Sequence, residues 1–330
     1  MLIKQIPGDF IVEEISNRKF SEKPYNYLIY SLEKINWDSF KIISALANAL
    51  NSKPKFIGFA GNKDKLAVTK QFISFYNIPK YRIDNIKIND VKLIFVGYSN
   101  ARINLGDLKG NNFIITVRKL KNKSEVPNFL YLENYFDDQR FGNKHNTHLI
   151  GKALVKRDFK KACEILSLDV KNNDYLGALR ISQRRLLRFY LSSYQSFIFN
   201  NILSEYISSI GKDRTISYSL GSLNISDSVV KNFKIPLISF DSVFPEKIKK
   251  IVEKILNEEK IKPDDFIFRE LTELNVESAY RNVFLNVNNI KCEFYNDELN
   301  KGYFKAVISF FLPKGAYATL LIKKLETYLK

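Results

Sequence analysis

Cysteine is scarce in this chain of 330 residues, where Cys163 and Cys292 are the only two. Two cysteines are too few for the disulfide framework of a small secreted protein or for a four-cysteine zinc site. We therefore expect two free thiols and a reducing compartment, the cytoplasm. The opening residues, Met1 to Lys4, lead to Pro7 without a basic stretch followed by an apolar one. We accordingly expect no secretory signal.

Long apolar runs and cofactor-binding glycine loops are also missing. No apolar run approaches the ~20 residues that span a membrane, so we expect no membrane interaction. The sequence has no Gly-x-Gly-x-x-Gly or Walker-type loop, which argues against dehydrogenases, kinases and helicases. Histidine occurs only as His145 and His148, a pair without a third ligand nearby and without the glutamate of a metalloprotease helix. We expect neither a metal nor a cofactor.

Basic residues outnumber acidic ones by 52 to 35, which gives a formal net charge of +17. Such an excess favours a polyanionic partner, and RNA is the natural candidate. Aromatic residues interleave with the charge, as stacking on bases would require. The alternative is that many lysines merely cover a solvated surface, so charge alone does not identify the substrate.

Apolar spacing predicts a helix followed by strands in the first part of the chain. Trp37, Phe40, Ile43, Ala47 and Leu50 recur at helical spacing, which indicates one amphipathic helix. Alternation and β-branched or aromatic residues then favour extended structure. The expected strands cover residues 56–60, 71–76, 91–96 and 113–117.

Helical spacing dominates the middle of the chain instead. The apolar residues there recur on one face, with basic residues opposite. We expect helices over residues 151–168, 186–207 and 245–256. A last strand is expected at residues 304–312, followed by a short C-terminal helix.

One carboxylate, Asp64, stands in a glycine-flanked loop between two expected strands, with Lys63 and Lys65 on either side. Lysine neighbours favour the ionised form of a carboxylate. Gly58 and Gly61 would let the backbone approach a bulky ligand closely. This arrangement suits a nucleophile or a base better than an acid. The alternative is an ordinary turn aspartate that satisfies amides of the loop.

The stretch around Asp64 reads Ala-Gly-Asn-Lys-Asp-Lys-Leu-Ala-Val-Thr-Lys-Gln, which resembles the signature of the TruD family of tRNA pseudouridine synthases. Five further segments are similar to family blocks and follow in the family's order, and the match is with a member of archaeal or eukaryotic type. The six segments span nearly the whole chain. They are residues 4–14, 58–71, 105–113, 134–142, 193–200 and 311–319.

The resemblance implies an α/β (α+β) fold with two domains. A pseudouridine synthase catalytic domain, built on a mixed and largely antiparallel sheet, would comprise residues 1–145 and 280–330. A mainly helical α/β insertion domain of the TruD type would interrupt it at residues 146–279. The length of the chain independently favours two domains.

The resemblance also implies the functional residues. Asp64 corresponds to the catalytic carboxylate, and Lys4 would be its electrostatic partner. Five positions fall in blocks that contact substrate in the family: Lys4, Phe10, Asn134, Phe136 and Tyr317. In the family, adjacent arginines are common where this chain has Tyr280 and Arg281, so one phosphate contact is in doubt.

The implied activity is isomerisation of a tRNA uridine, at position 13, to pseudouridine. It needs no cofactor and no obligate protein partner, and we expect a monomer. Asp64 could attack the ribose, attack the base or remove a ribose proton, and the sequence does not choose among these routes. The alternative is a non-catalytic protein that binds and folds tRNA with the same basic groove. Such a protein would have no use for the intact Asp64 loop.

Overall fold

The computed structural model describes residues 1–211, 214–227 and 231–329, which form two compact units. Unit 1 comprises Met1–Leu130, Val287–Ala318 and Leu325–Lys330, and unit 2 comprises Tyr131–Asn286 and Thr319–Lys324. Both units are therefore assembled from segments that are distant in the sequence.

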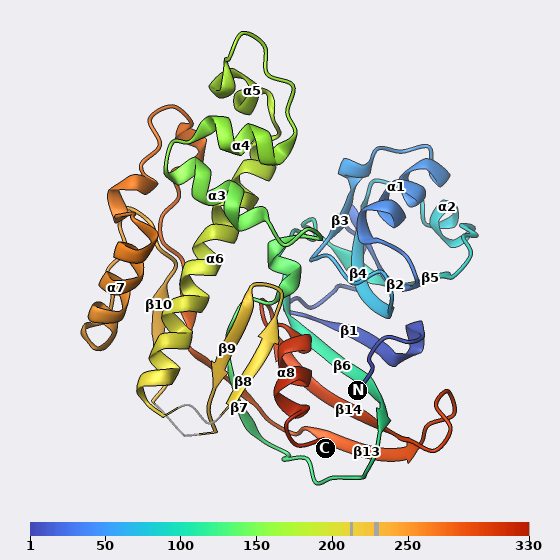
Figure 1. Ribbon diagram of the computed structural model, residues 1–330. Helices are drawn as coiled ribbons and strands as arrows, with labels where there is room; N and C mark the ends of the chain where they lie inside the picture. The colour runs from blue at the N-terminus through green and yellow to red at the C-terminus, as the bar shows by residue number, and fades with distance from the viewer. Residues whose placement is uncertain (212–213, 228–230, 330) are drawn as a thin grey trace. The chain divides into compact units, whose positions relative to one another are not determined.

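Unit 1 is built on an eight-stranded sheet in the order β13-β14-β6-β1-β4-β2-β5, with β3 paired to β4 (Figure 1). β1 and β4 run parallel, and the other pairs described for this sheet are antiparallel. The strands are β1 (Phe10–Ser16), β2 (Tyr27–Ile35), β3 (Ile57–Phe59), β4 (Val68–Tyr76), β5 (Val91–Ser99), β6 (Leu108–Leu120), β13 (Lys291–Asn296) and β14 (Phe304–Pro313).

Helices α1 (Ser39–Ala49) and α2 (Lys80–Asp84) complete unit 1, with short 3-10 turns at Pro7–Asp9 and Pro54–Phe56. The Asp38 side chain caps α1 by accepting hydrogen bonds from the Phe40 and Lys41 amides, and this fixes where the helix begins. The apolar face of α1 packs on alternate residues of β2 and β4 to form a core. Its fully buried members include Tyr30, Leu32, Ile42, Leu46, Ile73 and Phe75.

Unit 2 contains most of the helices, and the 26-residue α6 runs through it with α3 alongside (Figure 1). The α-helices are α3 (Thr147–Val155), α4 (Phe159–Leu166), α5 (Tyr175–Ile181), α6 (Arg184–Ser209), α7 (Lys249–Glu259) and α8 (Ala318–Leu325), which begins in unit 1. The 3-10 turns are Asp138–Phe141, Glu246–Ile248, Pro263–Phe266 and Thr272–Leu274.

The single helix expected at residues 151–168 is wrong, because α3 and α4 are separate. Arg157 has a left-handed backbone (φ 60°), which ends the first helix. The Asp158 side chain then accepts a hydrogen bond from the Lys161 amide at 3.0 Å and begins the second. The aspartate in the middle of the apolar pattern was the sequence signal for this break.

The described strands of unit 2 form three two-stranded sheets. β8 (Arg214–Tyr218) pairs with β9 (Gly221–Ile225), β10 (Lys234–Pro236) with β11 (Tyr280–Asn282), and β7 (Leu130–Glu133) with β12 (Phe284–Val287). β7 begins at the last residue of unit 1, and β12 ends just past unit 2.

The structure confirms the expected α/β class with largely antiparallel sheets. Cys163 and Cys292 are both free thiols, as predicted. None of the described helices combines the length and the apolar character needed to cross a membrane. The family division at residues 146–279 stays a prediction, because compact units need not coincide with family domains.

Candidate active site

Asp64 lies in the connection between β3 and β4, as the sequence predicted. β3 pairs with β4 from Ile57 opposite Phe75 to Phe59 opposite Ile73, so both ends of the loop start from one rigid sheet. A hairpin of this kind holds a loop in place while leaving its side chains free to act.

The two glycines of this loop have different roles. A Cβ atom at Gly58 would lie 2.4 Å from the Ile103 carbonyl oxygen and 2.5 Å from Ser74 Oγ, so a larger residue cannot fit there. A Cβ at Gly61 would meet nothing within 4 Å. Gly58 therefore serves packing inside unit 1, and only the surroundings of Gly61 are open to a ligand.

The Lys63 ammonium is paired with Glu14, although its position next to Asp64 had suggested that it supports that carboxylate. Its Nζ donates to Glu14 Oε2 at 2.7 Å, and both side chains are buried. Its backbone NH donates to Ser39 Oγ at 2.8 Å. Lys63 thus fastens the loop to β1 and to the first turn of α1.

Lys34 holds the loop from beneath. It lies on the buried face of β2 and is wholly inaccessible to solvent. Its Nζ donates to the carbonyl oxygens of Trp37 at 2.6 Å and of Asp64 at 3.2 Å. Burial lowers the pKa of Lys34 to about 8, although the charges of Asp38 and Asp64 act in the opposite direction. The buried Lys34 ammonium therefore contacts the main chain of the candidate catalytic residue.

The structure brings Lys4, Phe10 and Asp64 together in unit 1. The Lys4 ammonium donates to Asp64 Oδ2 and lies 4.0 Å from the centroid of the Phe10 ring. The side chains of Lys4 and Asp64 are 22% and 25% exposed. The pairing expected for these two residues is thus present, and the carboxylate still reaches the surface.

Phe10 is only 3% exposed, and its ring packs edge-on against Phe113 at 6.1 Å. Phe113 in turn stacks on Phe310 at 5.4 Å. The ring thus belongs to the core, and Lys4 covers it by a cation–π contact. Its contact with substrate stays a prediction.

Asn134 and Phe136 lie in unit 2, directly after β7, and both are buried. Asn134 Nδ2 donates to the Asn282 carbonyl oxygen at 3.0 Å. The Phe136 NH donates to Asn200 Oδ1 at 2.9 Å, and Asn200 Nδ2 donates to the Phe136 carbonyl oxygen at 2.8 Å. Two of the resembling segments, residues 134–142 and 193–200, thus meet at this point.

Arg281 supports the same short segment. Its Nε donates to the Asn134 carbonyl oxygen at 2.7 Å, and its Nη2 donates to the Tyr135 carbonyl oxygen at 3.0 Å. The guanidinium carbon lies 4.1 Å from the centroid of the Phe136 ring. Sequence reasoning considered this arginine only for a phosphate contact, whereas its fork fits two carbonyls and an aromatic face.

Tyr317 is partly exposed and lies in unit 1, between β14 and α8. The predicted substrate-binding residues are therefore distributed over both units, with Lys4, Phe10 and Tyr317 in unit 1 and Asn134 and Phe136 in unit 2.

The sequence did not single out Lys34 or Arg118. For Lys34 a signal existed, since Tyr30, Leu32 and Lys34 alternate on one face of an apolar strand. A lysine on the buried face of a strand is unusual and often functional. Arg118 shares a strand face with Ile114 and Thr116, and that pattern gave no reason to expect a buried arginine.

His148 is buried, stacks on Phe197 at 4.9 Å and meets the edge of Phe141 at 5.8 Å. Burial lowers the pKa of His148 to about 4. Within the described part of the chain, no three histidine, cysteine, aspartate or glutamate residues cluster as metal ligands would. His148 acts here as a neutral ring of the core.

The arrangement around Asp64 offers a partly exposed carboxylate that is paired with the Lys4 ammonium, and Lys34 holds its main chain through the Asp64 carbonyl oxygen. Such a group can attack an electrophilic carbon or remove a proton.

Comparisons with known proteins identify the family of the chain. The family model described as tRNA pseudouridine synthase D (TruD) matches residues 1–169 and 225–325. A Methanosarcina acetivorans protein named "Probable tRNA pseudouridine synthase D" is 30% identical, with 98% of this chain and 91% of that protein covered. A Methanocaldococcus jannaschii relative, "Probable tRNA pseudouridine synthase D 2", is 31% identical over the same shares of the two chains.

A crystal structure of the TruD protein from Methanosarcina mazei superposes with a TM-score of 0.72 at 28% identity and covers 99% of this chain and 93% of that one. The match to the family model covers well over half of the chain. The chain therefore belongs to the TruD family.

Proposed function

We propose that this protein converts uridine to pseudouridine in tRNA and that Asp64 is the catalytic carboxylate. The observation that carries the proposal is the Asp64 loop. Its signature is intact, and its carboxylate is paired with Lys4 and partly exposed. The family match supplies the reaction, and the named relatives supply tRNA as the substrate class.

The reaction exchanges one bond for another within a single nucleotide. The bond between ribose C1′ and uracil N1 breaks, and C1′ joins C5 of the same base. C5 loses a proton and N1 gains one, so no electrons are exchanged and no co-reactant is consumed.

Asp64 would begin this exchange by attack on C1′, by attack on the base or by removal of a ribose proton. Each route needs an ionised oxygen close to a nucleotide that has left the stack. Lys4 would stabilise the charge of that oxygen before the reaction begins, and the bonds from Lys34 and Ser39 would keep the loop from moving.

Unit 2 would contribute recognition of the base. Asn134 has an amide that can pair with a uracil edge, and we propose that the ring of Phe136 stacks on the extruded base. We propose that Tyr317 of unit 1 also contacts the substrate. We propose position 13 of tRNA as the target and a monomer in the cytoplasm as the working form.

A non-catalytic protein that folds tRNA is the alternative function. It would need the net charge of +17 and the aromatic residues, yet it would gain nothing from a carboxylate loop anchored at three points. The geometry therefore favours the isomerase.

The test uses an unmodified tRNA transcript and a second transcript with cytidine at position 13. Pseudouridine is mapped by base-specific chemical sequencing after incubation with wild type or with Asp64→Ala, and tRNA binding is measured in parallel. We expect modification of the first transcript alone, none by the variant, and equal binding by both proteins. Binding without modification of any tRNA offered to the wild type would favour the alternative.

A further inference from the structure

The segment that carries Lys4 has an unusual backbone. Lys4 has a left-handed conformation (φ 58°), which residues other than glycine rarely adopt unless their surroundings impose it. The segment is also short and mostly exposed, from Leu2 to Ile6, and it precedes the first strand. Contacts outside it must therefore fix the position of Lys4.

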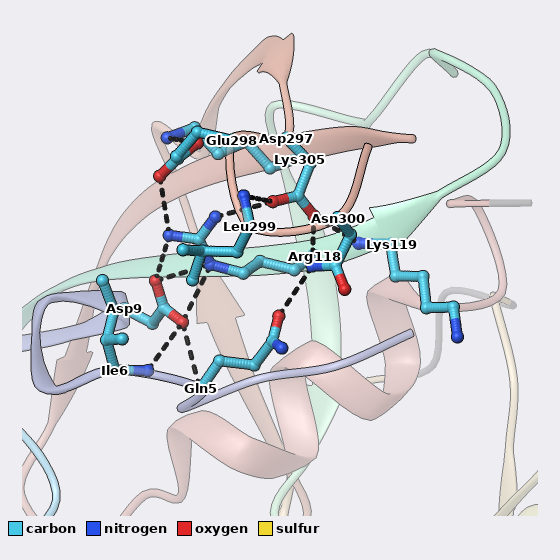
Figure 2. Close-up of polar contacts among 10 residues, drawn as sticks. All are labelled: Gln5, Ile6, Asp9, Arg118, Lys119, Asp297, Glu298, Leu299, Asn300 and Lys305. Atoms are coloured by element: carbon cyan, nitrogen blue, oxygen red, sulfur yellow. Dashed lines mark hydrogen bonds and ion pairs between the residues drawn. The ribbon is translucent and has the colours of Figure 1, made fainter. Parts of the chain in front are cut away.

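The residues on both sides of Lys4 form hydrogen bonds with other parts of unit 1. On one side, the Leu2 NH donates to the Arg118 carbonyl oxygen at 3.0 Å, and the Arg118 NH donates to the Leu2 carbonyl oxygen at 2.7 Å. On the other side, the amides of Gln5 and Ile6 donate to Asp9 Oδ2 at 3.0 and 3.2 Å (Figure 2). Residue 4 is thus bracketed by the main chain of residue 118 and the side chain of residue 9.

The Arg118 side chain joins these two anchors. Its Nε donates to both carboxylate oxygens of Asp9, at 2.9 and 3.0 Å, and its Nη1 donates to Asp297 Oδ1 at 2.8 Å. Arg118 and Asp9 are both almost wholly buried. The guanidinium reaches the two carboxylates from separate nitrogens, whereas a lysine would offer a single nitrogen at one point.

The connection between β13 and β14 closes the arrangement (Figure 2). Asp297 Oδ2 accepts from the Lys119 NH at 2.9 Å, which fixes its carboxylate on β6. Asn300 Nδ2 donates to Asp297 Oδ2 and to Gln5 Oε1, each at 2.8 Å. The C-terminal part of unit 1 thus reaches back to a residue next to Lys4. We refer to Asp9, Arg118, Asp297 and Asn300 as the Arg118 cluster.

We propose that the Arg118 cluster positions Lys4 for the reaction by holding its backbone against the Asp64 loop. The inference rests on the proposed function and adds four residues that act through Lys4 without touching the substrate. The Asp64 loop is fixed separately, by Lys34, Ser39 and Glu14. Since each partner of the ion pair has its own anchor, loosening one anchor changes the distance between the charges.

Two variants loosen the cluster to different degrees. Arg118→Lys keeps the charge but replaces the separate donors to Asp9 and Asp297 with a single ammonium group. Asn300→Ala removes only the bonds to Gln5 and Asp297 from a partly exposed position, so it preserves the fold if the first variant does not. Glu298→Gln is the matched control, because Glu298 accepts from the same guanidinium at 3.0 Å but does not contact the Lys4 segment.

Each variant is made in the wild-type background and in Lys4→Met, and single-turnover rates with saturating tRNA are measured together with tRNA binding. We expect Arg118→Lys and Asn300→Ala to slow the chemical step about fivefold or more, since small misplacements of catalytic groups have large effects on rate. In the Lys4→Met background the same changes should have less than about a twofold effect, because the cluster then has no group to position. Affinity for tRNA and the rate of Glu298→Gln should stay unchanged.

Hydrogen exchange of a peptide covering residues 1–9 provides a second readout, and it should become faster in both cluster variants. Equal loss of rate in the two Lys4 backgrounds, or no loss in either, would overturn the inference while leaving the proposed function intact. A wild type that binds tRNA and forms no pseudouridine would instead refute the proposed function, and the inference with it.

Discussion

The lowered pKa of Lys34, whose ammonium contacts the Asp64 main chain, can be tested without measuring activity. The perturbation is Lys34→Met, which keeps the length of the side chain and removes its charge. In the folded protein burial lowers the pKa of Lys34 from 10.5 to about 8, whereas the unfolded chain keeps the ordinary value. Between these two pH values the unfolded state binds more protons than the folded state, so stability rises with pH.

The size of the effect follows from the shift. A difference of about 2.5 pKa units corresponds to a gain of roughly 3 kcal/mol once pH exceeds 10.5, and to about 2 kcal/mol at pH 9.5. Below pH 8 the contribution is constant. The free energy of unfolding of wild type should therefore rise by about 2 kcal/mol relative to Lys34→Met between pH 7 and pH 9.5.

The assay is urea unfolding followed by tryptophan fluorescence. Trp37 is the only tryptophan of the chain, and its carbonyl accepts a hydrogen bond from Lys34, so the signal reports on unit 1 directly. The control is Lys70→Met on β4, because the bond to Glu13 raises the pKa of Lys70 and its contribution is lost only above pH 10.5. The reasoning would be refuted if the difference in free energy of unfolding between wild type and Lys34→Met stayed constant from about pH 7 to about pH 9.5.

Three further predictions concern other parts of the molecule. Gly58→Ala should lower the free energy of unfolding of unit 1 by about 2 kcal/mol or more, because the added methyl group overpacks the core. Gly61→Ala should change the same free energy by less than 1 kcal/mol. Urea unfolding followed by Trp37 fluorescence measures both values. Burial lowers the pKa of His148 from 6.5 to about 4. The free energy of unfolding should therefore fall by about 2 kcal/mol as pH drops from 7 to 4.5. The fall should be smaller for His148→Phe, and unfolding followed by circular dichroism measures both. Arg281→Lys should slow the chemical step while leaving the salt dependence of tRNA binding unchanged, since the lost bonds are to carbonyls; a shallower salt slope would instead indicate a phosphate contact.

Local patterns were enough to predict most elements of unit 1. The helix expected from Trp37 to Leu50 is α1, and the strand expected at residues 304–312 is β14. The strands expected at 71–76 and 113–117 exist but are longer, because pairing with neighbours extends them beyond their apolar centres. The helix expected at 186–207 is α6, and the one at 245–256 begins as a 3-10 turn and continues as α7.

Two features could not be derived in the same way, a hairpin without typical turn residues and the pairing of two distant strands. The hairpin of β8 and β9 turns at Ser219 and Leu220, a dipeptide without the asparagine or glycine that marks a tight turn. The parallel pairing of β1 with β4 joins segments more than 50 residues apart. Its register helps to place the N-terminal segment near the Asp64 loop, and no local pattern encodes such a register.

In the candidate site, too, the sequence indicated some residues and not others. Asp64 stood out because its loop carries glycine, lysine and a family signature, and its pairing with Lys4 was expected only through the family resemblance. The supporting residues did not stand out. Glu14 and Lys63 form a buried ion pair across 49 positions, and Arg118 joins residues 9 and 297. Partners at such separations become visible only when the chain is folded.

The central claim is that the Asp64 carboxylate performs the chemistry, and Asp64→Asn tests it most directly. This variant keeps the size of the side chain and a hydrogen-bonding oxygen for Lys4, and removes the negative charge. In a single-turnover experiment with saturating unmodified tRNA, we expect it to bind as tightly as wild type and to form no pseudouridine. Pseudouridine formation by Asp64→Asn at a rate close to that of wild type would contradict the account.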